Sequence, residues 1–216
     1  MNKRRIIFVP GKNPKPPADQ HRVLLWRTLL EGVRRAEPEC FEDMLRYEDI
    51  FILIAWTYLY YKETKDVSRD LPWIDALMNT HAASKEDVQE ANSWNRKLNS
   101  LLITMADILP AIIPLLPSAM SSSVKETNRY FNNNDDTARD IRDMLKKELK
   151  ACIANNEKVL LIGHSLGSVI AYDTLWELSH LEQLTGKVDL FMTIGSPLGL
   201  NYIQHRLQID GAREAQ

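Results

Sequence analysis

The segment Val159–Asp173 constrains the fold more than any other stretch of this chain. It opens with four apolar residues that suit a fully buried β-strand, and it ends with apolar residues that allow a helix with almost no exposed face. Between the two lies Gly163–Gly167, a G-x-S-x-G pentapeptide of sequence GHSLG. The pattern predicts a strand, a sharp turn and a helix, which is the structural context in which this pentapeptide carries chemistry.

The glycines of the pentapeptide have a steric reason. If Ser165 stands at the apex of a strained turn, the residues two before and two after it approach closely, and Gly163 and Gly167 avoid a collision there. The helix that follows directs its first backbone NH groups toward an oxygen that becomes negative beside Ser165, so the NH of Leu166 is the first expected oxyanion donor. The alternative is a glycine-rich turn whose serine is buried and does no chemistry.

In these residues the chain resembles the α/β-hydrolase superfamily, and more narrowly its serine esterases and lipases. GHSLG looks like their nucleophile elbow, and TIGSPLGLN at 193–201 is similar to the strand end that follows the elbow in class 3 lipases and related bacterial hydrolases. The resemblance implies an α/β fold with a three-layer, doubly wound, mostly parallel sheet and a helical cap. It also implies cleavage of a small ester or lipid substrate through an acyl-enzyme on Ser165, without a cofactor or a metal.

A proline-rich loop follows the first expected strand, Arg4–Val9. In the resembling family the loop at this place supplies the second oxyanion donor, which implies a backbone NH of Gly11 or Lys12. The usual His-Gly pair of the family is replaced here by Pro-Gly, so the choice between these two donors stays open. The alternative is a plain connection from strand to helix.

Periodicity outlines the rest of the expected α/β core. Asp19 is expected to cap a helix that ends near Glu37, and residues 49–56 read as a second buried strand, although 45–61 also fits one long apolar helix. A polar loop at 132–136 is expected to cap a helix over 136–153, and residues 189–194 form the strand after the elbow helix. These elements predict parallel strands joined by crossovers, with helices on both faces of the sheet.

Residues 62–134 are expected to form a helical cap inserted into the single domain of residues 1–216. The cap contains the apolar segment Leu101–Met120, but three prolines and Asp107 argue against a membrane-spanning helix. Such a cap can line an acyl pocket or make peripheral contact with a membrane surface. The alternative is that Leu101, Ile112 and Leu116 simply pack the cap onto the core.

The partners of a catalytic serine are not evident in the sequence. Hydrolases of this kind carry Ser, then an acid, then His along the chain, and a serine hydroxyl needs both partners to become a good nucleophile. His180 is expected at the far end of the elbow helix, and His205 with Asp210 follows the wrong order. His164 is adjacent to the serine within the motif, but the turn is expected to direct it elsewhere, to pack beside the oxyanion site. His21 and His81 have no supporting context. The sequence therefore suggests a truncated or frameshifted hydrolase whose acid and histidine lie beyond Gln216, with an exposed sheet edge after Ile194 that favours association.

Composition limits the function classes. The chain has 216 residues, 44% of them hydrophobic, and a formal net charge of −2, which gives no basic field for nucleic acid. Cys40 and Cys152 are too few for a disulfide framework or a zinc site, so a reducing cytoplasm is expected. The apolar stretch at the amino terminus ends at Pro10, too early for a signal peptide. The sequence leaves the oligomeric state open. It also leaves two alternatives to an active esterase, namely a noncatalytic hydrolase-like binding protein and an inactive truncated hydrolase.

Overall fold

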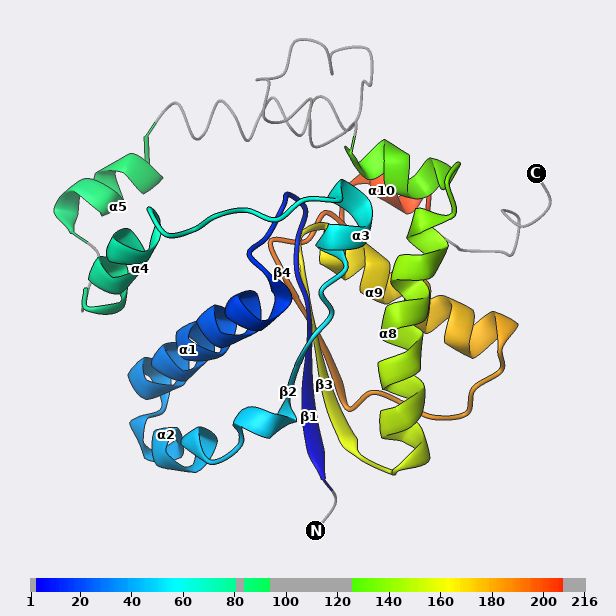
Figure 1. Ribbon diagram of the computed structural model, residues 1–216, viewed down its shortest axis with the longest axis horizontal. Coiled ribbons are helices and arrows are strands. Elements are labelled where there is room, and N and C mark those ends of the chain that lie inside the picture. The colour runs from blue at the N-terminus through cyan, green and yellow to red at the C-terminus, as the bar shows by residue number, and fades with distance from the viewer. Residues whose placement is uncertain (1–2, 81–83, 94–125, 208–216) are drawn as a thin grey trace.

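Four strands form a single all-parallel sheet in a computed structural model that describes residues 3–80, 84–93 and 126–207 (Figure 1). The strands are β1 (Arg4–Val9), β2 (Phe51–Leu53), β3 (Lys158–His164) and β4 (Leu190–Ile194), and their order in the sheet is β2-β1-β3-β4. β1 and β3 are paired over the whole length of β1, from Arg4 opposite Lys158 to Val9 opposite Gly163. The sheet is therefore held together by segments from the two ends of the described chain.

Helices cover both faces of the sheet (Figure 1). α1 (Ala18–Ala36) and α2 (Pro38–Leu45) lie on one side, and α8 (Thr137–Ala154) and α9 (Leu166–Trp176) lie on the other. Successive strand residues point to opposite faces, so Ile6 packs in the α1 cluster with Trp26 and Ile7 packs in the larger cluster under α8 and α9. The expected α/β class, with a parallel sheet between helical layers, is confirmed at this level.

The winding of the sheet reverses between β1 and β3. The chain leaves β1 through α1 toward β2 on one side, and it leaves β3 through α9 toward β4 on the other. The loop after β1 and the turn after β3 therefore leave the sheet at the same edge and lead to helices on opposite faces. Open parallel α/β sheets bind their ligands at such a reversal point, beyond the carboxyl ends of the strands. This topology brings Gly11 and Ser165 to one place.

Several elements have the predicted bounds. β1 is as predicted, β4 begins one residue later than predicted, and α8 differs from the predicted helix 136–153 by one residue at each end. The loop at 132–136 caps α8 as predicted, since Asn133 Oδ1 accepts the NH of Ala138 at 2.9 Å and Asp135 Oδ1 accepts the NH of Thr137 at 3.3 Å.

Two predictions near the amino terminus need correction. Asp19 does not cap α1, because the helix begins at Ala18 and its N-cap residue is Pro17, which has no side-chain acceptor. Asp19 instead lies in the first turn, where a carboxylate suits the helix dipole. The second strand is shorter than predicted, because a 3₁₀ turn (η1, Glu48–Ile50) precedes β2 and a short helix (α3, Thr57–Tyr61) follows it. The apolar run 45–61 is thus strand in its middle and helix at its end.

The region predicted to form a cap contains α4 (Leu71–Met78), α5 (Lys85–Ala91) and helical residues 126–132 among the described residues. Leu101, Ile112, Leu116, His81 and Asp210 lie outside the described residues. A π-helical turn, η3 (Glu177–Leu181), continues α9, and α10 (Asn201–Gln204) follows β4. In the part of the chain that the structure describes, no helix combines the length and the apolar character needed to cross a membrane.

β4 is an edge strand with an uncovered apolar face. Leu190, Met192 and Ile194 are 53%, 42% and 46% exposed, respectively. Leu190 and Met192 are in register with Leu160 and Ile162 of β3, which place them on the α1 side of the sheet. The exposed edge expected after Ile194 is therefore present, while self-association through it stays a prediction.

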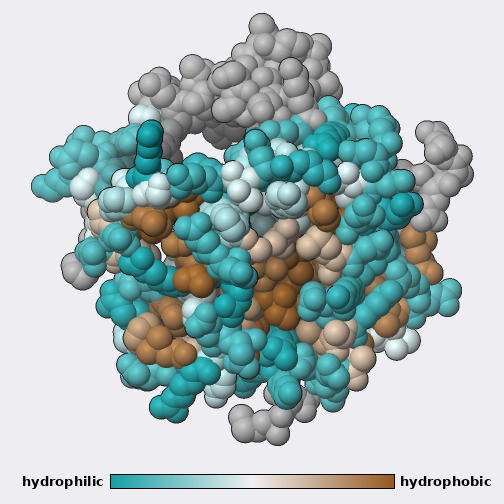
Figure 2. Space-filling model, in the orientation of Figure 1, coloured by the Kyte–Doolittle hydropathy of each residue, from teal (hydrophilic) through white to brown (hydrophobic). Residues whose placement is uncertain are grey.

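Figure 2 shows the face of the molecule that is seen in Figure 1. Polar side chains cover most of this face, and an apolar area lies in its middle, between the α1 and α8 sides.

Candidate active site

Ser165 lies between the end of β3 and the start of α9 in a strained backbone conformation. Its φ is 51° and its ψ is −125°, outside the regions that L-residues favour. Its NH donates to the carbonyl of Ile194 at 2.9 Å, which extends the pairing of β3 with β4 to the turn. The residue is half-buried whereas its neighbour Leu166 is buried, so Ser165 lies at the boundary of the core and not within it.

Both glycines of the pentapeptide are required by close backbone approach. A Cβ on Gly163 would lie 2.6 Å from the Cα of Ser168 and 3.1 Å from the carbonyl oxygen of Gly167. A Cβ on Gly167 would lie 2.2 Å from the carbonyl oxygen of Val9, at the end of β1. The two glycines therefore serve different contacts: Gly163 lets the turn close on itself, and Gly167 lets α9 pack directly on β1.

The loop after β1 packs against the turn. Gly11 is buried, and a Cβ there would lie 3.0 Å from both His164 Nδ1 and the Cβ of Ser165. The buried indole of Trp56 donates to the carbonyl of Pro10 at 2.8 Å, which fixes the start of the loop. The ammonium of Lys12 lies 3.7 Å from a carboxylate oxygen of Glu126, so its side chain is held by an ion pair and only its backbone is available to an oxyanion.

A pair of serine hydroxyls, which sequence reasoning missed, joins the turn to the next strand end. Ser168 is fully buried, donates to the carbonyl of Ser165 at 2.5 Å and lies 2.7 Å from the hydroxyl of Ser196. Gly195 has a φ of 53°, a backbone conformation that suits glycine and turns the chain after β4. A serine within an otherwise apolar helix face is the one signal in the sequence that points to this contact.

His164 occupies the space between the loop after β1 and the turn after β4. Its ring lies 3.0 Å from the Cβ position of Gly11 and 4.0 Å from that of Gly195. Burial, and then the charge of Lys15, lower the pKa of His164 below its usual value, which favours the neutral imidazole. A neutral imidazole beside the serine is chemically able to accept a proton, but the two side chains are not hydrogen-bonded to each other.

The other described histidines are dispersed. His180 stacks on Trp176 at 4.8 Å and lies at the far end of the elbow helix, as predicted. His205 follows α10 and is exposed, and His21 lies on α1. Within residues 3–80, 84–93 and 126–207, no histidine is hydrogen-bonded to Ser165 or to a carboxylate. No serine, histidine and acid triad is assembled by these residues.

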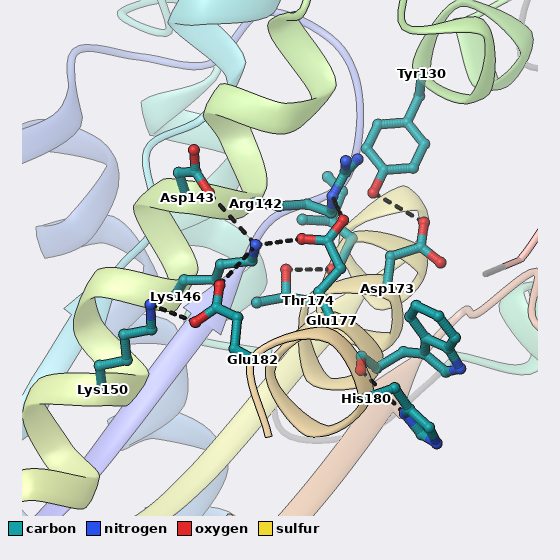
Figure 3. Close-up of polar contacts among 12 residues, drawn as sticks. Tyr130, Arg142, Asp143, Lys146, Lys150, Asp173, Thr174, Glu177, His180 and Glu182 are labelled. Atoms are coloured by element: carbon teal, nitrogen blue, oxygen red, sulfur yellow. Dashed lines mark hydrogen bonds and ion pairs between the residues drawn. The ribbon is translucent and has the colours of Figure 1, made fainter. Parts of the chain in front are cut away.

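A second polar cluster lies between α8 and the α9–η3 helix (Figure 3). Arg142 donates to Glu177 at 2.6 Å, Lys146 lies 2.5 Å from the second oxygen of Glu177, and Tyr130 donates to Asp173 at 3.0 Å. Burial, followed by the charge of Asp173, raises the pKa of Tyr130 well above its usual value. These contacts hold α8 and helical residues 126–132 against α9 and η3, so the role of this polar cluster is structural.

Other described features do not add ligands to the site. No three His, Cys, Asp or Glu side chains of the described residues lie together in a way that could hold a metal ion. Two surface hollows of about 410 and 420 Å³ are lined by residues of α1, α2 and α4 and by residues of 128–135, respectively. Neither of these two hollows is lined by Ser165.

The site thus consists of a half-buried hydroxyl, a helix start and a backbone loop at the reversal point of the sheet. This arrangement is chemically able to attack a carbonyl carbon and to donate backbone hydrogen bonds to the oxygen that becomes negative. Comparisons of the chain with protein-family models, with curated proteins and with solved structures gave no match. The residues of the two motifs and the local geometry are therefore the basis for any assignment.

Proposed function

We propose that this protein is a serine hydrolase of the α/β-hydrolase type that cleaves carboxylic esters through an acyl-enzyme on Ser165. The conformation of Ser165 carries the proposal. A φ of 51° and a ψ of −125° in a residue that is not glycine cost free energy, about 1–3 kcal/mol, and such strain gathers at functional sites. The turn holds this strain by means of Gly163 and Gly167, and the strained residue is the one with a nucleophilic oxygen.

The proposed reaction has two steps. The hydroxyl oxygen of Ser165 attacks the ester carbonyl and its proton passes to a base. The base returns this proton to the ester oxygen as the C–O bond breaks, so the alcohol leaves and the acyl-enzyme forms, which water then hydrolyses. Leu166 is the first residue of α9, so its NH has no acceptor within the helix and is free to bind the oxyanion. A backbone NH of Gly11 or Lys12 supplies the second donor. His164 is the candidate base among the described residues.

Labelling with a fluorophosphonate probe tests this function. The folded wild-type protein should react at Ser165, as located by peptide mass spectrometry, and Ser165→Ala should not react. Ser68→Ala is the matched control, because Ser68 is an exposed serine whose hydroxyl bonds to Asp66, far along the chain from the turn. Equal labelling of the wild type and Ser165→Ala, or no labelling of a folded wild type, would rule out the activated serine.

The second candidate is a noncatalytic protein that uses the same site for binding. It is favoured by one observation, namely that no described histidine is hydrogen-bonded to Ser165 or to a carboxylate. A binding protein should hold a small ester or lipid without turnover, and Ser165→Ala should keep that affinity. Parallel measurement of ester binding by calorimetry and of alcohol release separates the two candidates.

A further inference from the structure

We propose that the ester cleaved at Ser165 carries a carboxylate or phosphate group and that the ammonium of Lys15 binds this anionic group. The inference rests on the proposed function for the reacting bond, but the anion site itself is argued independently of catalysis. Three observations carry it: the position of Lys15 on the loop that packs on the turn, the absence of an ion pair for Lys15 among the described residues, and the pairing of its cationic neighbours.

Lys15 belongs to the same loop as Gly11, whose backbone packs against Ser165 and His164. The carbonyl of Lys15 accepts the NH of Lys65 at 2.8 Å, which fixes this part of the loop to the segment that follows α3. The Lys15 residue is half-buried. Its position is therefore set by the fold, and it does not extend freely from the surface.

The charge of Lys15 and the charges of its neighbours influence one another across four segments of the chain. Burial lowers the pKa of Lys15, and the ammonium groups of Lys65 and Lys12 lower it further. Burial and then the charge of Lys15 lower the pKa of His21, on α1, to about 4, and the same two causes lower the pKa of His164, at the elbow. The charge of Lys15 thus acts on both histidines, one on α1 and one at the end of β3.

The neighbouring lysines have acidic partners, whereas Lys15 has none among the described residues. Lys12 lies 3.7 Å from Glu126, and Lys65 lies 2.7 Å from Asp70. Lys15, His21 and His164 form no ion pair in the described part of the chain. A half-buried ammonium that lacks a counter-charge loses hydration without compensation, and a bound anion would restore the balance. The site therefore lacks one negative group, which an anionic substrate can supply.

The chemistry of Lys15 defines the ligand class. An ammonium is a compact charge with three donors, and it binds a carboxylate or a phosphate without the planar geometry that arginine requires. The predicted substrates are therefore esters with an anionic group near the scissile carbonyl, such as the half-ester of a dicarboxylic acid. Neutral esters of the same size should be poorer substrates.

Matched esters with one leaving group test the substrate class. We would compare kcat/KM for p-nitrophenyl hemiglutarate, which is anionic, with that for neutral p-nitrophenyl butyrate. Wild type should prefer the anionic ester, and Lys15→Met should lower the ratio of the two values by about 10-fold or more, because a charge-assisted contact is lost. Lys15→Arg should keep most of the preference. Lys158→Met, an exposed lysine at the opposite end of β3, should leave the ratio unchanged.

Binding of inorganic phosphate tests the anion site without catalysis. The ring protons of His21 and His164 should shift with saturation when phosphate is added to the wild type at constant pH and ionic strength, and this saturation should be lost in Lys15→Met. Saturation without labelling of Ser165 would reject the hydrolase and keep the anion site. Ser165-dependent hydrolysis with an unchanged ester ratio in Lys15→Met, or no saturation in the wild type, would overturn the inference.

Discussion

The interface between α8 and α9 and the carboxyl edge of the sheet both remove charged side chains from water, but they treat those charges differently. At the interface Arg142 donates to Glu177 at 2.6 Å, and Lys146 contacts the same carboxylate. At the edge, Lys15 is half-buried without a counter-charge among the described residues, and His164 favours its neutral form. Paired charges are what a stable helix interface requires, whereas a half-buried, unpaired ammonium on the loop beside a strained serine agrees with the proposed anion site.

The largest expected effect concerns the close contact of Gly167, in α9, with the end of β1. Gly167→Ala should abolish folding or destabilise the protein by more than about 4 kcal/mol, because the new Cβ would lie 2.2 Å from the carbonyl oxygen of Val9. Gly32→Ala is the control, since a Cβ there, in the middle of α1, would meet nothing within 4 Å beyond the adjacent backbone of its own helix. It should stabilise the protein by about 0.5–1 kcal/mol in urea unfolding. Equal effects would remove the claim that α9 packs on β1 through a glycine.

The second-largest expected effect concerns the buried ion pairs of Glu177. Glu177→Gln should destabilise the protein by about 3 kcal/mol, because Arg142 keeps a buried charge that has lost its partner. Asp143→Asn removes an exposed carboxylate 3.6 Å from Lys146 in the same cluster and should change stability by less than about 0.5 kcal/mol. Urea unfolding at neutral pH measures both. Similar values would mean that burial does not distinguish these ion pairs.

A smaller expected effect concerns the pH dependence of stability, to which His21 contributes because its charged form has no counter-charge among the described residues. His21 has a pKa lowered to about 4, so the unfolded chain takes up a proton near pH 6.5 before the folded protein does. Stability should therefore fall as the pH falls from 6.5 to 4. His21→Gln should reduce this loss by about 1 kcal/mol, allowing for the partial exposure of the ring. Thermal unfolding at pH 7 and pH 4.5 measures the difference, and parallel pH profiles would contradict the lowered pKa.

The smallest effect on stability is expected at the apolar edge strand. Met192→Lys should change the unfolding free energy by less than about 0.5 kcal/mol but should weaken self-association, because a charge on an edge strand opposes pairing with another chain. Val23→Lys, a substitution at a 53% exposed residue on α1, is the control. Sedimentation velocity over a range of concentrations should show fewer large species for Met192→Lys alone. A monomeric wild type would contradict association through β4.

Local sequence patterns are sufficient to predict the strand, turn and helix that position Ser165. The strand, turn and helix around Ser165 follow from an apolar run, two glycines and a second apolar run, all within fifteen neighbouring positions. β1 and α8 were likewise predicted from their own residues. The run 45–61 was ambiguous because apolar residues alone do not distinguish a buried strand from a helix, and its division depends on the pairing of β2 with β1.

The contacts that the sequence did not predict join residues from different elements. Ser168 of α9 meets Ser196 at the turn after β4, and Arg142 of α8 meets Glu177 of η3, only because these elements pack together in the fold. Periodicity places Arg142 on α8 but does not show which carboxylate faces it. In the same way, the sequence does not show that Lys15 lacks an acidic partner, whereas Lys12 and Lys65 have one. Such partners depend on tertiary packing, which a pattern of single residues does not contain.

The pairing of β1 with β3 has a consequence for how the protein reaches its native state. Arg4 is paired with Lys158, so the central ladder joins positions separated by most of the chain. During synthesis, Ile6, Ile7 and Val9 emerge from the ribosome long before their partners, and contacts of such high sequence separation form slowly. We therefore expect the serine and the loop beside it to come together late in folding. Until then the apolar residues of the first strand lack their sheet partners, and unpaired apolar strands favour aggregation.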